Sequence, residues 1–276
     1  MSRPPVSGMT RLAAVIGDPV RHSRSPLIHN AAYEALGLDW IYVALPVPAG
    51  HGFAAVRSMV DLGISGLNVT MPHKTDAADA CDELTSEAEA LRSVNTVVLR
   101  DDGTLLGAST DGEGFMRSLA DEGVSVTGKS VLIIGAGGAG RAVTHALGAA
   151  GAIVTIAARR IEAARESAVL APDARVMLMS EIDSAISESE IIVNATPIGM
   201  AVEPSLFNTD LLTPAHLVCD LVYQPAMTPL LEAAERRSAS IVGGIGMLLH
   251  QAAVAFEMHT GQAAPIEVMR RAIAIL

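Results

Sequence analysis

The sequence is poor in aromatic residues, cysteine and positive charge. Aromatic residues make up only 3% of the 276 residues, which leaves little for the base-stacking surfaces of nucleic-acid-binding proteins. The net charge of -11 opposes binding to nucleic acid or to an anionic membrane surface. The two cysteines, Cys81 and Cys219, form neither a disulfide framework nor a zinc pattern. We therefore expect neither nucleic acid nor a membrane as a partner.

Long hydrophobic runs and several common catalytic motifs are also missing. No apolar run approaches the ~18 residues of a membrane span, and the stretch MSRPPVSGMTRLAAVIGDP lacks the apolar core of a signal peptide. The chain is therefore expected to be cytoplasmic. No G-x-S-x-G motif is present, which removes support for an acyl-transfer nucleophile. The histidines show no paired ligand spacing, so no metal is expected.

One glycine-rich segment indicates a dinucleotide site. The apolar run 131–134 is typical of a strand buried on both faces, and Gly135, Gly137 and Gly140 follow it in G-x-G-x-x-G spacing before a helical pattern. The first glycine allows a tight turn, the second a close approach of a pyrophosphate, and the third the packing of helix on strand. Gly138 and Ala139 complete the predicted phosphate site. The alternative is a glycine-rich turn without a ligand.

The residues after the next expected strand indicate which dinucleotide binds. That strand, 152–157, is followed by Ala158, Arg159 and Arg160, and no carboxylate appears before Glu162. An acidic residue would take the ribose hydroxyls of NAD, whereas guanidinium groups pair with a 2′-phosphate. The sequence therefore predicts NADP(H) rather than NAD(H). Alternatively, one or both arginines are merely solvated at a helix start.

Alternating strand and helix patterns predict an α/β protein with two domains. Residues 1–111 with 246–276 are expected to form a mixed-sheet α/β domain, and residues 112–245 a Rossmann-like, doubly wound domain. Strands are expected at 12–17, 40–47, 64–70, 94–99, 104–108, 131–134, 153–157, 175–178, 190–194, 217–221 and 240–243. Helices are expected at 25–36, 52–62, an acidic 75–91, 112–122, 161–170, 228–237, 246–260 and 265–276.

Small polar clusters at the ends of these elements are candidates for chemistry. Ser23 and Ser25 stand at a helix start and could hold a carboxylate, although Ser25 could also be a simple N-cap before Pro26. Lys74, at a strand-to-helix turn, could be a base or bind a carboxylate. Asp111 could be functional or an N-cap. Further polar or glycine-containing clusters supply Asn95, Thr96, Asp220, Tyr223, Thr228, Gly246, Met247 and Gln251.

Taken together, these clusters resemble the shikimate dehydrogenase family. The resemblance covers nearly the whole chain, through HSRSPLIHN, NVTMPHK, VNT, TDGEGF, GAGGAGRA, NATPIGM, DLVYQP and GMLLHQAAVAFEMHTG in the order and spacing of the family. It implies NADP-dependent interconversion of shikimate and 3-dehydroshikimate, a step of aromatic amino acid biosynthesis. It also implies two domains with the active site in the cleft between them. A homodimer is left open.

The resemblance also implies roles for individual residues. Lys74 matches the catalytic lysine and Asp111 its aspartate partner, so that the pair would take the hydroxyl proton while hydride passes to the nicotinamide. Ser23 and Ser25 match the carboxylate-binding pair, with Tyr223 nearby. The ring hydroxyls would be contacted by Thr70, Asn95, Asp111 and Gln251. The further residues implied to bind the cofactor, several of them beside its nicotinamide, are Ala195, Thr196, Val222, Gly244, Gly246 and Met247.

Three departures from the family pattern keep other functions open. Arg92-Ser93 replaces the usual Gly-Ala, Ser109 replaces an asparagine, and Ala158-Arg159-Arg160 replaces Asn-Arg-Thr. The first two flank substrate residues and leave quinate or aminoshikimate as alternative substrates. The third keeps the key arginine. A non-catalytic ligand sensor is the alternative of another class, and it is disfavoured because both Lys74 and Asp111 are present.

Overall fold

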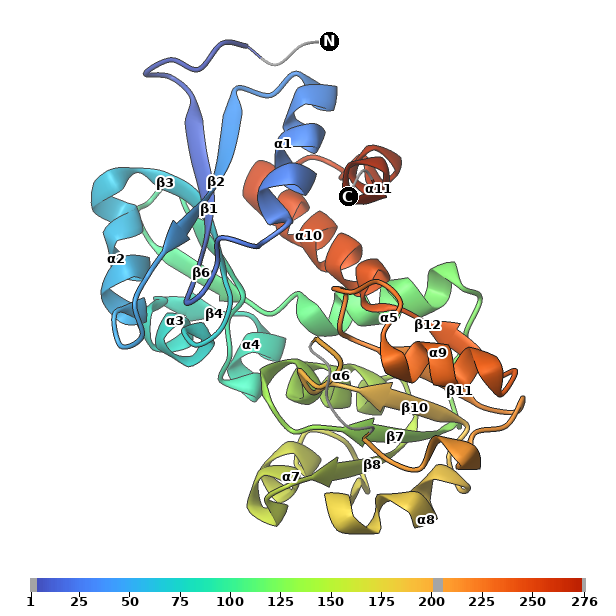
Figure 1. Ribbon diagram of the computed structural model, residues 1–276. Helices are drawn as coiled ribbons and strands as arrows, with labels where there is room; N and C mark the ends of the chain where they lie inside the picture. The colour runs from blue at the N-terminus through green and yellow to red at the C-terminus, as the bar shows by residue number, and fades with distance from the viewer. Residues whose placement is uncertain (1–3, 201–205, 275–276) are drawn as a thin grey trace. The chain divides into compact units, whose positions relative to one another are not determined.

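The computed structural model describes residues 4–200 and 206–274, and the chain divides into two compact units (Figure 1). Unit 1 consists of residues 1–110 and 249–276, and unit 2 of residues 111–248. The second division falls within helix α10 (Gly244–Thr260), between Leu248 and Leu249.

Unit 2 is built on a six-stranded, all-parallel sheet. Its strand order, β12-β11-β10-β7-β8-β9, is the 6-5-4-1-2-3 order of dinucleotide-binding folds. The strands are β7 (Ser130–Ile134), β8 (Ile153–Ala158), β9 (Arg175–Leu178), β10 (Ile191–Asn194), β11 (Leu217–Asp220) and β12 (Ser240–Val242). The predicted fold class is confirmed.

Helices cover both faces of this sheet because its strands are apolar on both sides. Val131 and Ile133 pack with one group of helices, and Leu132 and Ile134 with another, as the alternation of side chains along a strand requires. The first group is α5 (Asp111–Asp121), α6 (Gly138–Ala149) and α7 (Ile161–Ala168). The second is α8 (Ile182–Ile186) and α9 (Pro229–Arg236), and the short 3-10 helices are η1 (Met179–Glu181) and η2 (Thr209–Leu211).

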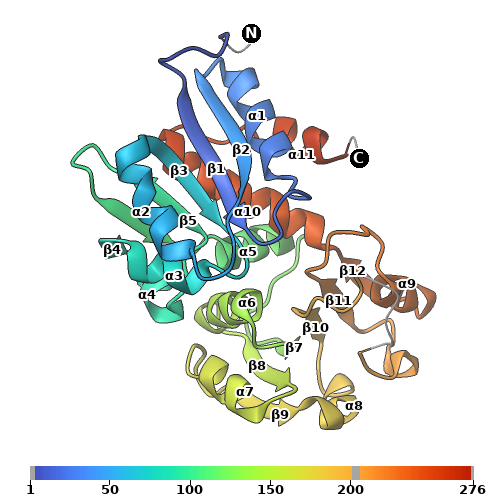
Figure 2. The same ribbon diagram turned by 60° about the vertical axis from the view of Figure 1, so that its left-hand side comes forward.

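Unit 1 contains a mixed six-stranded sheet, of which β2, β1, β3 and β5 can be followed side by side in Figure 2. The order is β2-β1-β3-β5-β6-β4; β3–β5 and β5–β6 are antiparallel and the other pairs parallel. The strands are β1 (Arg11–Gly17), β2 (Trp40–Pro46), β3 (Ile64–Val69), β4 (Glu83–Leu84), β5 (Thr96–Leu99) and β6 (Leu105–Ala108). The helices are α1 (Ser25–Leu36), α2 (Gly52–Leu62), α3 (Lys74–Ala80), α4 (Ser86–Leu91) and α11 (Ile266–Ala274).

A buried aromatic cluster joins α1 and the unit 1 part of α10 to this sheet. His29 of α1 stacks on Tyr42 of β2, with ring centroids 4.3 Å apart and planes inclined by 7°. Tyr33 and Phe256 pack beside them, and His259 lies 6.3 Å from His29. Neither ring nitrogen of His29 has a hydrogen-bond partner within the described chain. His29 therefore serves as a neutral, stacked ring.

We expect the two buried histidines of this cluster to make unit 1 sensitive to acid. Burial, and secondarily His259, lower the pKa of His29, and burial lowers the pKa of His259 to about 4. The unfolded chain, with histidine pKa near 6.5, then binds more protons, so stability present above about pH 6.5 is lost as the pH falls toward 4. The loss should be roughly 1 kcal/mol per pH unit for each histidine, measured by urea unfolding at several pH values.

Replacement of either ring by phenylalanine tests this origin of the acid sensitivity. His29→Phe and His259→Phe should each flatten the dependence of unfolding free energy on pH, whereas His22→Ala, at an exposed position, should leave it unchanged. An unaltered slope in both phenylalanine variants would assign the acid sensitivity to other groups.

The predicted single acidic helix over 75–91 is wrong. The structure instead has α3 and α4 separated by the short strand β4. α3 ends at Ala80, and the extended Cys81 leads to Asp82, whose carboxylate accepts from the N–H of Leu105 at 2.8 Å. Thr85 caps α4 by accepting from the N–H of Ala88 at 3.3 Å, as threonine does at helix starts. The other boundaries shift by a few residues, and the last two residues of the helix expected at 265–276 lie outside the described residues.

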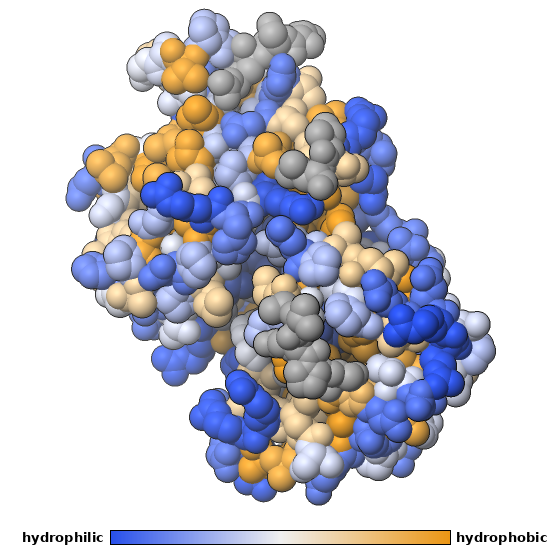
Figure 3. All heavy atoms as spheres, in the orientation of Figure 1, coloured by the Kyte–Doolittle hydropathy of each residue, from blue (hydrophilic) through white to orange (hydrophobic). Residues whose placement is uncertain are grey.

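Within residues 4–200 and 206–274, no helix combines the length and the apolar character needed to cross a membrane. On the face in Figure 3, hydrophobic residues are scattered among hydrophilic ones. Isolated exposed apolar residues of this kind are usual on protein surfaces.

Candidate functional site

Three of the predicted substrate residues lie together in unit 1, at the carboxyl end of β3. Thr70 follows that strand, and its N–H donates to Ile16 of β1 at 2.9 Å. The neighbouring N–H of Val69 donates to the carbonyl of Asn95 at 2.8 Å. The carbonyl of Lys74, the first residue of α3, accepts from Val94 at 2.9 Å. Backbone hydrogen bonds therefore hold Thr70, Lys74 and Asn95 together at the end of the sheet where β3 finishes.

A chain of buried hydrogen bonds leads from this end of the sheet toward the predicted carboxylate-binding serines. Tyr42 lies near Ser25, whose side chain opposes the rise that burial causes in the pKa of Tyr42, and the Tyr42 hydroxyl donates to Asn68 Oδ1 at 2.7 Å. The amide of Asn68 donates to the Thr96 hydroxyl at 3.1 Å, which in turn donates to Asn95 Oδ1 at 3.1 Å. Thr96 is one of the residues that the polar clusters offer for chemistry, whereas the sequence patterns do not single out Tyr42 or Asn68, although Asn68 begins the motif NVTMPHK.

The end of this chain of hydrogen bonds fixes the backbone before Asp111. Asn95 Oδ1 accepts from the N–H of Thr110 at 2.8 Å, and Asn95 Nδ2 donates to the Thr110 hydroxyl at 3.0 Å. Asp111 is the next residue, and it begins α5 in a buried position. The Asn95 side chain therefore holds Thr110, the residue immediately before Asp111.

The remaining predicted substrate residues occupy separate elements. Ser23 is half-buried before α1, and its hydroxyl accepts from the N–H of Ser25 at 3.3 Å. Ser25 lies inside the helix, after an Arg24 N-cap, so the alternative of a Ser25 N-cap is wrong. Tyr223 follows β11 in unit 2, and Gln251 lies on the unit 1 part of α10; both are half-buried.

The glycine-rich turn of unit 2 has the geometry that a dinucleotide requires. Gly135 has φ of +110°, and a Cβ there would lie 2.9 Å from Thr196 Cγ2. A Cβ on Gly140 would collide with the carbonyl oxygen of Gly135. Gly137, the N-cap of α6, instead faces open space, with nothing within 4 Å of a Cβ position. Gly138 and Ala139 open the helix, so its N–H groups are available to an anion.

Substitution of Gly137 should weaken dinucleotide binding without unfolding the protein. Its φ of -80° suits alanine, and the added methyl group would enter the space in which a pyrophosphate approaches the backbone. We expect Gly137→Ala to weaken NADPH binding about ten-fold or more, as for an overpacked contact of ~1–3 kcal/mol. Fluorescence titration with NADPH measures this effect. Gly50→Ala, at φ of +83°, is a control for backbone strain alone and should leave NADPH affinity unchanged.

Arg159 and Arg160 follow β8 as the sequence predicts, and both are exposed. Arg160 is the N-cap of α7 but makes no capping hydrogen bond through its side chain. The two guanidinium groups are therefore not required to close the helix start. The position, at the carboxyl end of the second strand of the sheet, is where dinucleotide-binding folds contact the adenosine ribose.

The other predicted cofactor residues gather around the ends of β10 and β11. Ala195 and Thr196 follow β10, and Gly135 packs against both of them. Val222 follows β11, and a Cβ on Gly244 would lie 2.8 Å from its carbonyl oxygen. Gly246 and Met247 continue α10 in unit 2, where Gly246 packs against Ser118 of α5.

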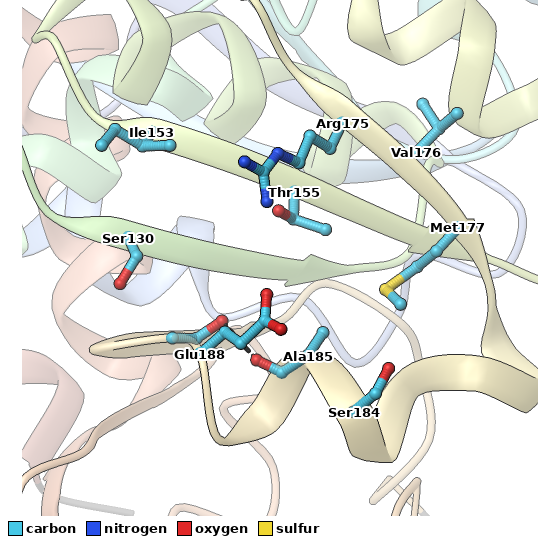
Figure 4. Close-up of a pocket in the computed structure, with 10 residues that line it drawn as sticks. Ser130, Ile153, Thr155, Arg175, Val176, Met177, Ser184, Ala185 and Glu188 are labelled. Carbon is cyan, nitrogen blue, oxygen red and sulfur yellow. Dashed lines mark hydrogen bonds between the residues drawn. The ribbon is translucent and has the colours of Figure 1, made fainter.

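A separate pocket in unit 2 lies at the amino ends of the strands, opposite to the carboxyl ends where the cofactor is expected (Figure 4). Its walls include Ser130, Ile153 and Arg175, which are the first residues of β7, β8 and β9. Parallel strands place these starts opposite the glycine-rich turn, and ligands of such sheets bind at the carboxyl ends. Among the described residues, no group of three or more His, Cys, Asp or Glu side chains could hold a metal ion.

The substitutions that depart from the family pattern lie beside the substrate residues. Arg92 ends α4 with φ of +46°, a left-handed conformation that glycine adopts at lower cost, and its side chain is exposed. Ser93 and Ser109 are half-buried, two residues before Asn95 and two before Asp111. The arginine is thus a helix-end feature, whereas the two serines are close in sequence to predicted ring-binding residues.

Comparisons with known families agree along the chain. A model described as the shikimate dehydrogenase substrate binding domain matches residues 15–97. One described as shikimate / quinate 5-dehydrogenase matches 118–206, and one described as the shikimate 5'-dehydrogenase C-terminal domain matches 244–274.

Individual relatives are similar over nearly their whole length. A shikimate dehydrogenase (NADP(+)) of Methanopyrus kandleri is 43% identical, over 97% of this chain and 96% of its own. The shikimate 5-dehydrogenase of Thermus thermophilus, solved with NADP(H) and shikimate, has a TM-score of 0.86 and 32% identity, covering 96% of this chain and 99% of that one. A quinate dehydrogenase from Corynebacterium glutamicum, solved with NAD, has a TM-score of 0.90 and 31% identity, covering 97% and 99%.

Proposed function

Since this chain belongs to the shikimate dehydrogenase family, as its motifs predict, we propose that it interconverts shikimate and 3-dehydroshikimate with NADP(H). The observation that carries the proposal is the hydrogen-bonded chain in unit 1, which runs from Tyr42, near Ser25, to Asn95, beside Lys74. It supplies a carboxylate-binding end and a hydroxyl-binding end within one rigid layer, as a hydroxylated ring acid requires.

Lys74 and Asp111 are the proposed catalytic pair. In the oxidative direction the C3–H bond breaks with transfer of hydride, and the C3 hydroxyl loses its proton to the Lys74 amine, leaving a ketone. Bound NADP⁺ supplies the hydride acceptor. Asp111 stabilises the resulting ammonium of Lys74 and accepts a hydrogen bond from a ring hydroxyl. In the reverse direction the Lys74 ammonium returns the proton to the ketone oxygen.

The other residues of the site orient the ring. Ser23 and Ser25, with Tyr223, hold the carboxylate, while Thr70, Asn95 and Gln251 bind ring hydroxyls. Because Asn95 Oδ1 is already committed to Thr96 and Thr110, the orientation of its amide is set before substrate arrives. Such preorganisation is the entropic part of catalysis.

The residues of unit 2 fit NADP. Gly137 leaves open space at the start of α6, which has twelve residues. Arg159 and Arg160 offer exposed guanidinium groups to a 2′-phosphate. The nicotinamide end is assigned to Ala195, Thr196, Val222, Gly244, Gly246 and Met247. The relative from Methanopyrus kandleri carries NADP(+) in its name, in agreement with the predicted cofactor.

The test is NADPH formation by the purified protein with shikimate, quinate and aminoshikimate in parallel, repeated with NAD. Strong turnover of shikimate with NADP supports the proposal. Preferred turnover of another acid would assign Ser93 and Ser109 to an altered substrate site, a candidate favoured by the similarity to quinate dehydrogenase. No turnover of any acid would favour a ligand-sensing protein. A cytoplasmic location and a homodimer stay predictions.

A further inference from the structure

Two buried polar side chains at the ends of β10 and β11 have no role in the proposed chemistry. Asn194 is 0% and Asp220 1% exposed. The Asn194 amide donates to Asp220 Oδ1 at 2.9 Å. Burial raises the pKa of Asp220, and hydrogen bonds from Thr228, Val222 and Asn194 oppose that rise. Burial of a carboxyl group is costly unless hydrogen bonds compensate it, and Asp220 accepts three of them, from Asn194, Val222 and Thr228.

The pair holds the segments that follow both strands. Asn194 Oδ1 accepts from the N–H of Thr196 at 3.0 Å and from its hydroxyl at 2.7 Å, and Asn194 Nδ2 donates to the Ile198 carbonyl at 3.0 Å. Asp220 Oδ1 accepts from the N–H of Val222 at 3.0 Å. Two loops that are far apart in sequence are therefore tied to a single side-chain pair.

The second oxygen of Asp220 reaches a third element. Asp220 Oδ2 accepts from the Thr228 hydroxyl at 2.6 Å, and that hydroxyl also caps α9 by accepting from Leu231 at 3.3 Å. Gly199 packs beside the same atoms, with its Cβ position 3.8 Å from Asp220 Oδ2. A carboxylate, which only accepts hydrogen bonds, suits this position because Asn194, Val222 and Thr228 all donate to it.

One tied loop faces the glycine-rich turn, because Thr196 lies against Gly135. The other lies against the start of α10, where a Cβ on Gly244 would lie 2.8 Å from the carbonyl oxygen of Val222. Displacement of the Asn194–Asp220 pair would therefore move the Thr196 loop relative to the turn that receives the dinucleotide, and the Val222 loop relative to the start of α10.

We propose that Asp220, acting through Asn194, Val222 and Thr228, is a positioning residue that sets the geometry of the nicotinamide-binding loops. This inference rests on the proposed function, because it assigns Thr196 and Val222 to the nicotinamide. It differs from a purely structural role in what it predicts for kinetics. A structural role changes only the fraction of folded protein, whereas a positioning role changes cofactor affinity and hydride transfer within the folded protein.

The experiment uses Asp220→Asn and Thr228→Val in the full-length protein. Asparagine keeps the shape of Asp220 but turns an N–H toward a donor, and valine keeps the size of Thr228 but removes its hydroxyl. We expect NADPH affinity to fall about five-fold or more and kcat about ten-fold or more, because small displacements of reacting groups are costly. KM for shikimate should change less than NADPH affinity, since Tyr223 is the only proposed substrate residue that lies on a tied loop.

Two matched variants separate the roles. Thr228→Ser keeps the hydroxyl and should restore both NADPH affinity and kcat. Thr85→Val removes a helix cap of the same kind from α4 in unit 1, and it should lower the melting temperature without changing NADPH affinity. If Asp220→Asn does not fold, Thr228→Val decides, because the carboxylate keeps its other two hydrogen bonds.

Wild-type NADPH affinity and kcat in the folded Thr228→Val and Asp220→Asn variants, with only lower melting temperatures, would overturn the proposal. NADPH affinity is measured without shikimate. A wild-type protein that fails to oxidise shikimate would therefore contradict the proposed reaction while leaving the role of Asp220 to be judged by cofactor binding.

Discussion

Lys74→Ala should lower kcat with shikimate by about a hundred- to ten-thousand-fold, the range that general acid–base catalysis contributes. The alcohol cannot release hydride without also releasing its hydroxyl proton, and Lys74 is the proposed acceptor. NADPH binding should be unchanged, because the glycine-rich turn and the arginines belong to unit 2, whereas Lys74 belongs to unit 1. Steady-state assays in both directions, combined with NADPH fluorescence, measure the two properties separately.

Lys74→Arg separates proton transfer from simple charge. Arginine keeps the positive charge but does not give up its proton in proteins, so kcat should fall nearly as far as with alanine while KM for shikimate rises less. The sequence contains one other lysine, Lys129, which pairs with Glu190 at an exposed position. Lys129→Ala is therefore a matched control and should keep wild-type kinetics. Substantial turnover by Lys74→Ala would refute the catalytic assignment.

Local patterns predicted the dinucleotide-binding fold because its signal is continuous in sequence. A buried strand, three glycines and a helix start stand within residues 131–149; Gly135 and Gly140 meet steric demands of that one turn, and Gly137 leaves open space beside it. The family and the fold class, both predicted from the sequence, are confirmed.

Features that depend on distant residues could not be predicted from local patterns. The expected single acidic helix does not form because β4, which lies within it, pairs with β6, more than twenty positions away. The carboxylate of Asp82 also accepts a hydrogen bond from the N–H of Leu105. The links Tyr42–Asn68 and Asn68–Thr96 span 26 and 28 residues, and Asn194–Asp220 spans 26. Asn68 and Asp220 stand in the motifs NVTMPHK and DLVYQP, which the sequence alone singles out. Their partners became evident only when the sheets brought the strand ends together.

Removal of the two arginines after β8 should change which dinucleotide the enzyme uses. If Arg159 and Arg160 bind the 2′-phosphate, the double variant Arg159→Ala/Arg160→Ala loses at least one charge-assisted interaction of ~1.5–3 kcal/mol. KM for NADP should then rise roughly ten- to a hundred-fold or more. KM for NAD should stay the same, because NAD has no phosphate at that position. Parallel assays with NADP and NAD at saturating shikimate measure the ratio of the two KM values.

The chain offers a close control for this experiment. Arg175 is an exposed arginine of the same unit, but it begins β9 at the opposite end of the sheet. Arg175→Ala should leave the preference for NADP intact, whereas a general effect of lost positive charge would lower it in both variants. An equal loss of affinity for NADP and NAD in the double variant would mean that the arginines support the adenosine site without reading its phosphate. The selectivity ratio thus decides whether two solvent-exposed side chains, which the helix start does not need, determine the cofactor.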